Sequence, residues 1–387
     1  MHLFFSVGEP SGDEHAAEVI EEILSRHPET RISGFGGPCM AQTACEQLYP
    51  LANHAVMGVF RVLPLLLMYI KQIRRAGLWF QNERPDAVVL VDCPGFNWWV
   101  ARQAKKHGIP VYYYLPPQLW AWAPWRIRKV RKYVDHILSA LSFEVEWYRQ
   151  RGVEVDFVGH PFFAEVARHP LDQEVLSSLQ NDEHRVIGVL PGSRTQEVKR
   201  NFPVMLKVLS RVHAKHPDVQ FPVACYRWEH VELCRSLLAK NHRHLPIELH
   251  LNNTSEIIDA ADCCLMVSGS VSLELLARTT PAVVLYRSSW LLASVARFLI
   301  ICRYMTLVNL LAGREMMPEF PFVTHTSRYV TQMSQILDNW LSSEADRQTA
   351  VRELAELRSA VAQPDGIERT ADFLLSRVET KVVKQAA

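Results

Sequence analysis

Short apolar runs alternate with longer amphipathic stretches along the chain. The runs in the first half predict strands at residues 3–7, 32–35, 87–91, 111–114 and 136–139, and those in the second half at residues 186–190, 221–224, 247–250, 264–267 and 282–286. Amphipathic stretches follow many of these runs, the first over residues 15–26. Strands that are continuously apolar and alternate with helices are typical of parallel sheets covered on both faces. The pattern therefore predicts an α/β fold.

The two series of strands predict two doubly wound domains. Gly159, His160 and Pro161 punctuate the junction between them, and a chain of 387 residues suits two domains of about 150–200 residues each. We expect an N-terminal domain over residues 1–163 and a C-terminal domain over residues 164–365. The end of the chain, about residues 344–384, predicts two helices separated by Pro-Asp-Gly.

Composition narrows the possible classes of protein. With 48% hydrophobic and 21% charged residues the chain can bury a large core, and a net charge of +1 gives no indication of a nucleic-acid partner. The N-terminus lacks the pattern of a secretory signal, and no run of about 20 apolar residues occurs, so we expect a cytoplasmic chain without a membrane-spanning helix. No two of the 8 cysteines have Cys-x-x-Cys spacing, which favours reduced thiols.

The loops that follow strands are the candidate sites, because ligands bind such sheets outside the carboxyl ends of the strands. The first loop contains Glu9 in Gly-Glu-Pro-Ser-Gly-Asp and leads into a helix, whose first amides can face a ligand. Ser11 or Asp13 as a helix cap is the alternative. Asp92 directly follows another strand. Its carboxylate could take a proton from a substrate hydroxyl, or cap the next helix.

A third loop has the residue types of a diphosphate clamp. Gly192, Ser193 and Arg194 follow a strand and precede a helix, so an arginine and free backbone amides would lie together. A surface ion pair of Arg194 is the alternative. No Asp-x-Asp pair for a metal-bound sugar nucleotide occurs. We therefore expect Arg194 and helix N-termini to neutralise a leaving diphosphate, with no metal and no cofactor.

Two further loops complete the set. Ser268, Gly269 and Ser270 open a helix and suit a phosphate, and Glu274, one turn further on, suits a ribose diol. Glu274 could instead complement the helix dipole. Asn309 is polar within an apolar run, which suggests a specific hydrogen bond in the site or a helix cap.

Taken in order, these motifs resemble those of the lipid A disaccharide synthases. The matches are Gly-Glu-x-Ser-Gly-Asp at 8–13, Gly-Pro-x-Met at 37–40, Val-Met-Gly at 56–58, Asp-x-Pro-x-Phe-Asn at 92–97, Trp-Ala-Trp at 120–122, Gly-His-Pro at 159–161, Leu-Pro-Gly-Ser-Arg at 190–194, Ser-Gly-Ser-x-x-Leu-Glu at 268–274 and Asn-Leu-Leu-Ala-Gly-Arg at 309–314. Pro10 and Gly95 stand where the family has alanine and a second aspartate. The resemblance spans nearly the whole chain.

The resemblance implies a GT-B fold, in which two Rossmann-like domains face each other across a cleft and the helix at about 366–387 crosses back to the N-terminal domain. It implies an inverting glycosyltransferase that joins UDP-2,3-diacylglucosamine to 2,3-diacylglucosamine 1-phosphate and releases UDP and a β-1,6-linked disaccharide phosphate. The N-terminal domain would hold the acceptor at the inner-membrane surface, as a peripheral protein, and the C-terminal domain would hold the donor. A homodimer is left open.

Each candidate residue receives a role from this reaction. Asp92 is the first choice of base for the acceptor hydroxyl, and Glu9 is the second. Arg194, with the serines and glycines of both donor loops, would hold the diphosphate, Glu274 the nucleoside, and Asn309 the donor phosphate or sugar.

Two segments, 60–80 and 290–301, are apolar and basic enough to lie in a membrane interface. Ordinary core helices are the alternative. The residues expected to face lipid or the acceptor are Met57, Phe60, Leu63, Leu66, Met68, Arg126 and Arg128, although a solvated helix face would explain the arginines too.

Two other functions remain open from the sequence. A different GT-B enzyme, such as a UDP-N-acetylglucosamine 2-epimerase or a transferase with a soluble acceptor, would need no lipid-facing segment. A non-catalytic sugar-nucleotide sensor would bind the donor without consuming it, and would not depend on Asp92.

Overall fold

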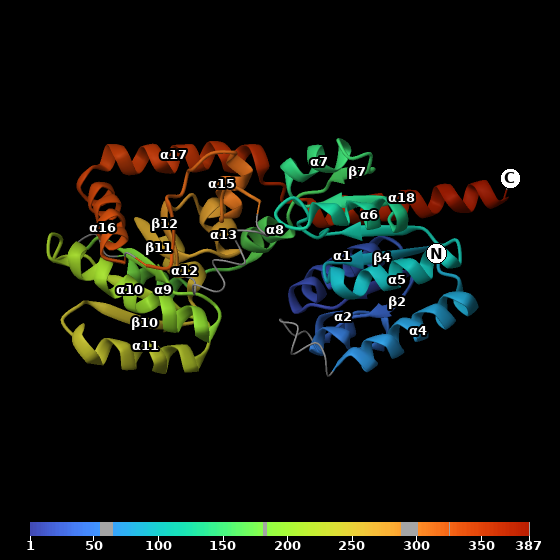
Figure 1. The fold of residues 1–387 in the computed structure, drawn as a ribbon, viewed down its shortest axis with the longest axis horizontal. Coiled ribbons are helices and arrows are strands. Elements are labelled where there is room, and N and C mark those ends of the chain that lie inside the picture. Colours follow the sequence, from blue (N-terminus) through green and yellow to red (C-terminus); the bar gives the residue numbers. More distant parts are fainter. Residues whose placement is uncertain (55–64, 181–183, 288–300, 325, 387) are drawn as a thin grey trace. The chain divides into compact units, whose positions relative to one another are not determined.

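The structure, a computed structural model, describes residues 1–54, 65–180, 184–287, 301–324 and 326–386. The chain divides into two compact units (Figure 1). Unit 1 comprises Met1–Ala164 and Gln363–Ala387, and unit 2 comprises Glu165–Ala362. The sequence places the divisions after residues 163 and 365, and the structure places them after residues 164 and 362.

Unit 1 is built on a parallel sheet of seven strands in the order β3-β2-β1-β4-β5-β6-β7. The strands are β1 (His2–Val7), β2 (Arg31–Phe35), β3 (Glu46–Tyr49), β4 (Ala87–Val91), β5 (Val111–Tyr114), β6 (His136–Ser139) and β7 (Val155–Phe157). All five predicted strands are present. The edge strands β3 and β7 were not predicted, because they are short and partly exposed and so lack an apolar run.

Helices cover both faces of this sheet. They are α1 (Pro10–Arg26), α2 (Pro38–Gln42), α4 (Leu66–Glu83), α5 (Pro94–Lys106), α6 (Ile127–Tyr133), α7 (Ser142–Arg149) and α18 (Gly366–Ala386), with α8 (Pro161–Arg168) at the boundary of the unit. Helix α1 begins five residues before the predicted start at 15, since proline is well suited to the first helical position.

The core of unit 1 has two halves, one on each face of the sheet. Leu3, Phe5 and Val7 of β1 point to the face covered by α1 and α18, whereas Phe4 points to the face covered by α4 and α5. This alternation follows from the two-residue period of a strand. Helix α18, drawn in red in Figure 1, contributes its own buried residues to the first half. The crossing of the last helix back to the N-terminal sheet, which the resemblance implies, is therefore present.

The chain returns to unit 1 beside the Gly-His-Pro motif. Gly159 has a φ of +94°, and a Cβ on this residue would lie 2.5 Å from the Cβ of Gln363. Only glycine fits such an approach without strain. His160 is half-buried next to it, and its Nδ1 accepts a hydrogen bond of 3.2 Å from the amide of Phe162. Burial, and then the charge of His15, lower the pKa of His160 to about 3. The motif thus fixes the point where the returning chain packs.

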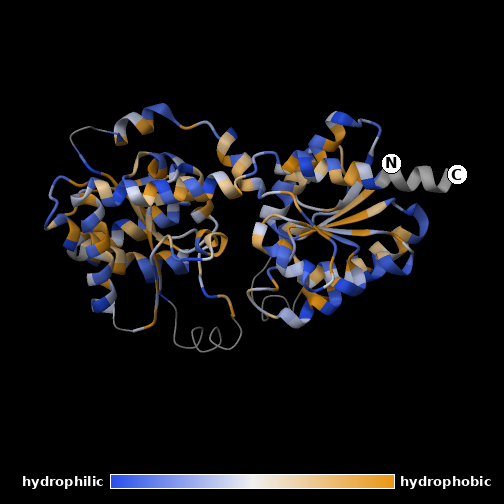
Figure 2. Ribbon diagram, turned by 90° about the horizontal axis from the view of Figure 1, so that it is seen from above, coloured by the Kyte–Doolittle hydropathy of each residue, from blue (hydrophilic) through white to orange (hydrophobic). Residues whose placement is uncertain are grey.

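Unit 2 contains a parallel sheet of six strands in the order β10-β9-β8-β11-β12-β13. The strands are β8 (Ile187–Leu190), β9 (Phe221–Cys225), β10 (Ile247–Leu251), β11 (Cys263–Val267), β12 (Ala282–Arg287) and β13 (Glu319–Phe322). Five were predicted, and the short edge strand β13 was not. Figure 2 shows that strands carry much of the hydrophobic colour, in agreement with the buried runs of the sequence.

The helices of unit 2 pack around this sheet. They are α9 (Gln173–Leu179), α10 (Thr195–His213), α11 (Trp228–Asn241), α12 (Thr254–Ala260), α13 (Val271–Arg278), α15 (Leu307–Ala312), α16 (Thr326–Ser342) and α17 (Glu344–Val361). The break predicted at 364–366 separates α17 from α18.

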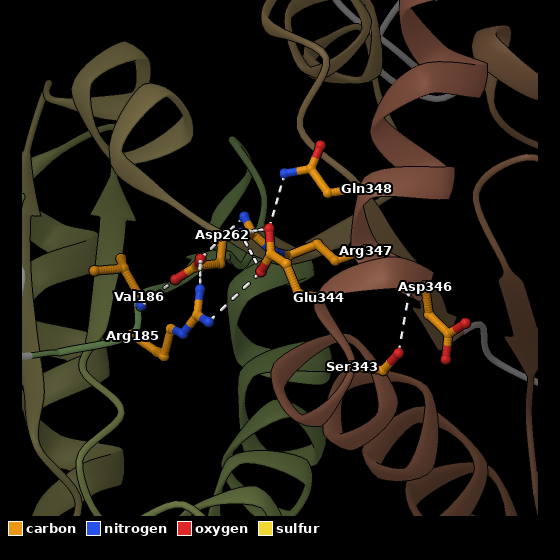
Figure 3. Close-up of polar contacts among 8 residues, drawn as sticks. All are labelled: Arg185, Val186, Asp262, Ser343, Glu344, Asp346, Arg347 and Gln348. Carbon is orange, nitrogen blue, oxygen red and sulfur yellow. Dashed lines mark hydrogen bonds and ion pairs between the residues drawn. The ribbon is translucent and has the colours of Figure 1, made fainter.

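An ionic network fastens α17 to the strands of unit 2 (Figure 3). Asp262, just before β11, accepts a 2.9 Å hydrogen bond from the amide of Val186 and pairs with Arg185 at 2.8 Å and with Arg347 at 3.0 Å. Arg347 also pairs with Glu344 at 2.7 Å, in the first turn of α17. Because Asp262 pairs with both Arg185 and Arg347, the network connects the start of α17 to the neighbouring strands β8 and β11.

Candidate active site

Four of the predicted loops follow the central strands of the two sheets. In unit 1 the strand order reverses between β1 and β4, which precede the loops of Glu9 and Asp92. In unit 2 it reverses between β8 and β11, which precede the loops of Arg194 and Ser268. A reversal of strand order leaves a crevice at the carboxyl ends of the strands, where ligands bind in such sheets. Each unit therefore presents its candidate residues at its own switch point.

Asp92 stands at the end of β4 in a strained backbone conformation. Its φ is +48° and that of Cys93 is +42°, so two successive residues with a Cβ occupy the left-handed region. Hydrogen bonds hold this turn: the carbonyl of Asp92 accepts from the side-chain amide of Asn97 at 2.8 Å and from the hydroxyl of Tyr113 at 2.7 Å. Helix α5 begins after Cys93, so the alternative that Asp92 caps this helix is wrong.

The carboxyl groups of Glu9 and Asp92 interact electrostatically. Burial, and then the charge of Asp92, raise the pKa of Glu9 to about 7. Burial also raises the pKa of Asp92, while a backbone hydrogen bond from Cys93 and the charge of His15 oppose that shift. Burial therefore favours the neutral form of both carboxyl groups, and the charge of Asp92 adds to this effect at Glu9. In a pair of this kind, one carboxylate can accept a proton from a substrate while the other carboxyl group stays neutral.

The loops of Glu9 and Asp92 pack against each other through glycines. A Cβ on Gly8 would lie 2.5 Å from the Sγ of Cys93, and a Cβ on Gly12 would lie 3.6 Å from the Cβ of Asp92. A larger residue at Gly8 would push the two loops apart, whereas the distance at Gly12 is an ordinary van der Waals contact. The glycines therefore bring the two carboxylates to the same edge of the sheet.

Of the two residues considered as caps of α1, Asp13 caps a different helix. Among the described residues no side chain caps the N-terminus of α1. The carboxylate of Asp13 instead accepts hydrogen bonds from the amides of Gly37 at 2.6 Å, Cys39 at 2.8 Å and Met40 at 3.2 Å. It thereby caps α2 and joins the first motif to the Gly-Gly-Pro motif. Capping of α1 by Ser11 or Asp13 is therefore wrong, and the first amides of that helix remain directed at the switch point.

In unit 2 the loop after β8 has the form expected of an anion site. Gly192 has a φ of +114°, and a Cβ there would lie 2.8 Å from the Cβ of Glu197. Ser193 is exposed, and the side chain of Arg194 is 61% exposed and pairs with Glu197 at 2.8 Å. This ion pair is the alternative considered from the sequence. It does not exclude anion binding, because an exposed pair contributes little and can exchange partners.

The loop after β11 leaves room at its glycine. No described heavy atom lies within 4 Å of a Cβ built on Gly269, so packing within the described residues does not explain why glycine is present. Ser270 precedes α13 without capping it, as far as the described residues show. Ser268 donates a hydrogen bond of 3.2 Å to the carbonyl of Met305. The amides of Ser272 and Leu273 donate to the carbonyls of Gly269 and Ser270, so the open space beside Gly269 is the feature that suits the close approach of a phosphate.

Glu274 lies in the first turn of α13 and is largely buried. Its Oε1 pairs with the Nε of Arg278 at 3.2 Å, and Arg278 also pairs with Asp259 at 2.9 Å. The carboxylate is thus held in one orientation by a neighbour on the same helix. Its role toward a ribose stays a prediction.

Asn309 has a structural role and not the predicted ligand contact. It is fully buried, and its Oδ1 accepts hydrogen bonds from the amides of Met316 at 2.7 Å and Met317 at 2.9 Å. Its Nδ2 donates to the carbonyl of Met317 at 2.7 Å and to Glu319 at 2.9 Å. All four hydrogen-bonding positions of the amide are therefore occupied by the protein. Thr306, not Asn309, caps α15.

Asn309 instead supports the loop after β11 through Glu319. The carboxylate of Glu319 accepts hydrogen bonds from the amide of Met305 at 2.8 Å and from the amide of Thr306 at 2.7 Å. Met305 in turn receives the hydroxyl of Ser268. Asn309, the first residue of the motif at 309–314, is thus linked through Glu319 and Met305 to the loop after β11.

The residues expected to face lipid or the acceptor are only partly described. Met57, Phe60 and Leu63, and nearly all of segment 290–301, lie outside the described residues. Leu66 is 47% exposed on α4, and Leu67 (80%) and Leu78 (65%) are exposed on the same helix. Met68 instead packs against the core of unit 1. The expected contact of Met68 with lipid is therefore wrong. Arg126 stacks on Trp122 at 4.4 Å, and Arg128 is exposed. Across the described ranges, no helix is long and apolar enough to cross a membrane.

Several residues of the site were not identified from the sequence. Tyr113 and His15 act on Asp92 from other elements. Glu197 and Glu319 support the loops after β8 and β11. Glu197, at the third position of α10, is the one with a local signal, since its side chain accepts a 3.3 Å hydrogen bond from the amide of Arg194 in the manner of a capping box. The contact from Tyr113 depends on the pairing of β4 with β5.

Comparisons with known proteins identify the family. The chain matches the family model described as lipid-A-disaccharide synthetase over residues 3–364. It is 35% identical over 373 residues to the lipid-A-disaccharide synthase of Anaeromyxobacter sp. (strain K), and 96% of each chain is covered.

Solved structures show the same fold. An S. aureus MnaA–UDP co-structure matches with a TM-score of 0.65 at 11% identity, covering 98% of this chain and 97% of the other. MurG from Acinetobacter baumannii matches with a TM-score of 0.57 at 14% identity, covering 97% and 99%. The two doubly wound sheets therefore form a GT-B fold, as expected. The chain belongs to the lipid-A-disaccharide synthetase family, the glycosyltransferases of lipid A biosynthesis.

Proposed function

We propose that the chain transfers a diacylglucosaminyl group from UDP-2,3-diacylglucosamine to the 6-hydroxyl of 2,3-diacylglucosamine 1-phosphate, with inversion at the anomeric carbon. Family membership supports the type of reaction. The observation that carries the mechanism is the carboxylate of Asp92, held in a strained turn beside Glu9 at a switch point. Strain that is held by several hydrogen bonds is often found at functional sites.

Asp92 acts as the general base in this mechanism. Its carboxylate takes the proton of the acceptor 6-hydroxyl while that oxygen forms a bond to the anomeric carbon of the donor. The bond from this carbon to the diphosphate breaks at the same time, and UDP leaves with the electron pair. Attack from the face opposite the diphosphate inverts the configuration. In this step Glu9, whose pKa is raised to about 7, holds a proton, and Asp92 carries the negative charge.

The loops of unit 2 hold the leaving group. The guanidinium of Arg194 and the amides at the start of α10 and α13 stabilise the negative charge that develops on the diphosphate. Gly269 leaves the space into which the phosphate fits, and Glu274 binds the ribose. The UDP named in the MnaA co-structure supports a uridine diphosphate ligand for this fold.

Unit 1 receives the acylated acceptor at the inner-membrane surface. Leu66, Leu67 and Leu78 are exposed on α4, and Lys71 and Arg74 are exposed on the same helix. A helix with exposed leucines and cations lies favourably at the interface of an anionic bilayer. The two acyl chains of each substrate would then stay in lipid while the sugars reach Asp92.

The test is an assay of the purified full chain with both acylated substrates in detergent, following disaccharide and UDP. We expect both products from the wild type, and a loss of at least about a hundredfold in Asp92→Asn with an unchanged melting temperature. Glu21→Gln, an exposed carboxylate on α1, is the matched control and should retain full activity. Normal turnover by Asp92→Asn would remove the base from the mechanism. Epimerised donor without disaccharide, or donor binding without turnover, would support the two other functions instead.

A further inference from the structure

A pocket in unit 2, away from the loops described above, is lined by cationic and hydroxyl groups. It has a volume of about 290 Å³ and lies between the second half of α10, the end of α11 and the start of α16. Lys207 and Arg211 face it from α10, and His242 lies just beyond α11. The hydroxyl-bearing residues are Ser210, Thr326 and Ser327. Every polar side chain among these described lining residues can donate a hydrogen bond, and none carries a negative charge.

The positive groups of this pocket lie close enough to act on one another. Lys207 and Arg211 are one helical turn apart, so they project from the same face of α10. Burial, and then the charges of His244 and Lys207, lower the pKa of His242. The Nδ1 of His242 is 3.1 Å from the hydroxyl of Ser210, and the guanidinium of Arg211 contacts the hydroxyl of Thr331. An anion bound beside Lys207 would offset the effect of this lysine on the charged form of His242.

The nearest acidic residue of α16 is already engaged. Asp338 lies about three turns beyond Thr326, where it pairs with Lys215 and with His216 at 2.8 Å. Its carboxylate is therefore engaged by two basic side chains outside the pocket. Thr326 and Ser327 are the first residues of α16, a helix of 17 residues, so backbone amides add to the donors at this end of the pocket.

The pocket is distinct from the donor loops. Lys207 is twelve residues beyond Thr195, the first residue of α10, which corresponds to about 18 Å along the helix axis. Ligand pockets of about 300–1,000 Å³ hold drug-sized molecules, so this one suits a single phosphate with a small substituent. A doubly acylated sugar would not fit inside it.

We propose that the pocket formed by Lys207, Arg211, His242 and the start of α16 binds a phosphate group, supplied either by free phosphate or by the headgroup of an anionic phospholipid. The cavity, its two cationic side chains and the lack of a negative charge among its described lining residues carry this inference, which does not depend on the proposed catalytic role of unit 1. Two cations, an imidazole and several hydroxyls match the oxygens of one phosphate.

The test follows the imidazole resonances of His242 in the full chain, assigned through their loss in His242→Asn. Saturating UDP is present throughout, so that the donor loops are occupied. Titration with inorganic phosphate should shift the His242 resonances with a millimolar or lower Kd. Lys207→Gln/Arg211→Gln should weaken binding at least tenfold. Arg235→Gln, which removes an exposed charge from α11, is the matched control and should bind like the wild type.

A second arm separates the two sources of phosphate. Vesicles of phosphatidylcholine containing phosphatidic acid should shift the same resonances in the wild type, and not in the double variant, if a headgroup is the ligand. Lys207→Gln alone keeps the contact between Arg211 and Thr331, so it tests the site if the double variant is unstable. The proposal is overturned if neither phosphate nor vesicles shift His242, or if Arg235→Gln weakens binding as much as the double variant.

Discussion

The hydroxyl of Tyr113 donates a 2.7 Å hydrogen bond to the main-chain carbonyl of Asp92. Tyr113 is fully buried on β5, the strand next to β4. Asp92 and Cys93 both have positive φ angles, so their turn would relax toward an extended conformation without external support. The hydrogen bond therefore connects the core of unit 1 to the direction of the proposed base.

Tyr113→Phe should separate orientation of the base from folding. We expect a loss of about 1 kcal/mol in stability, from one buried hydrogen bond, and a fall of roughly tenfold in turnover. Tyr148→Phe is the control, since that hydroxyl also donates to a main-chain carbonyl, of Pro117 at 3.0 Å, in the same unit. Denaturation and steady-state kinetics measure both effects. An equal loss of turnover in the two variants would mean that only stability matters.

Gly8 and Cys93 should be coupled energetically. A Cβ on Gly8 would meet the Sγ of Cys93 at 2.5 Å and its Cβ at 3.1 Å. Gly8→Ala should therefore cost about 1–3 kcal/mol and displace the loop of Glu9. Adding Cys93→Ala removes the sulfur and should restore part of the stability and turnover. A double-mutant cycle measures this coupling, and additive losses would contradict the predicted contact.

Alanine substitution at two glycines of unit 2 should have different effects, on stability at Gly192 and on UDP binding at Gly269. Gly192→Ala places a Cβ at a φ of +114° and 2.8 Å from Glu197, so we expect a loss of about 1–3 kcal/mol. Gly269→Ala has no described neighbour to clash with and should change stability by less than about 0.5 kcal/mol. It should nevertheless weaken UDP binding about tenfold, because the methyl group fills the proposed phosphate space. Calorimetric titration with UDP measures this, and unchanged affinity would place the diphosphate elsewhere.

The exposed face of α4 should contribute to membrane binding. Leu67→Ser/Leu78→Ser replaces two side chains that are 80% and 65% exposed, so stability should change by less than about 0.5 kcal/mol. Co-sedimentation with vesicles containing anionic lipid should fall severalfold, since apolar area at the interface is lost. Leu251→Ser, an exposed leucine of unit 2, should leave it unchanged. Equal binding by all three proteins would argue against α4 as the contact.

The loops at the two switch points could be predicted because they follow apolar strands. Runs such as residues 87–91 are buried on both faces, and the polar and glycine residues after them have no place in a core. The same criterion fails for β3, whose side chains are partly exposed. It also cannot show that Asp13 caps α2, because its partners lie more than twenty residues away.

Asn309 illustrates a different limit. Its polarity within an apolar run correctly indicates a specific hydrogen bond, because a buried amide must be satisfied. The sequence does not show whether the partner is a ligand or the chain itself. The partners are main-chain groups of Met316 and Met317, which a following loop brings back to α15. That loop geometry has no local pattern, so the residue was assigned to the donor.

Glu9→Gln should distinguish the two candidate bases. The pKa of Glu9 is raised from 4.5 to about 7 by burial and by Asp92, so Glu9 holds a proton over much of the neutral range. If Asp92 is the base, an amide can replace the neutral acid, and turnover at pH 7 should fall no more than about tenfold. If Glu9 is the base, Glu9→Gln should be as inactive as Asp92→Asn, and the rate of the wild type should rise with pH through about 7.

The same substitution has an effect on stability that does not involve catalysis. The folded chain binds the proton of Glu9 more tightly than the unfolded chain does, so the free energy of unfolding decreases as the pH rises from about 4.5 to about 7. Glu9→Gln removes this decrease. Relative to the wild type, the variant should gain about 1 kcal/mol between pH 5 and pH 8, after allowance for solvent screening of a partly exposed group. Urea denaturation of both proteins at the two pH values measures the gain, and a constant difference would mean that the carboxyl of Glu9 titrates near its ordinary pKa.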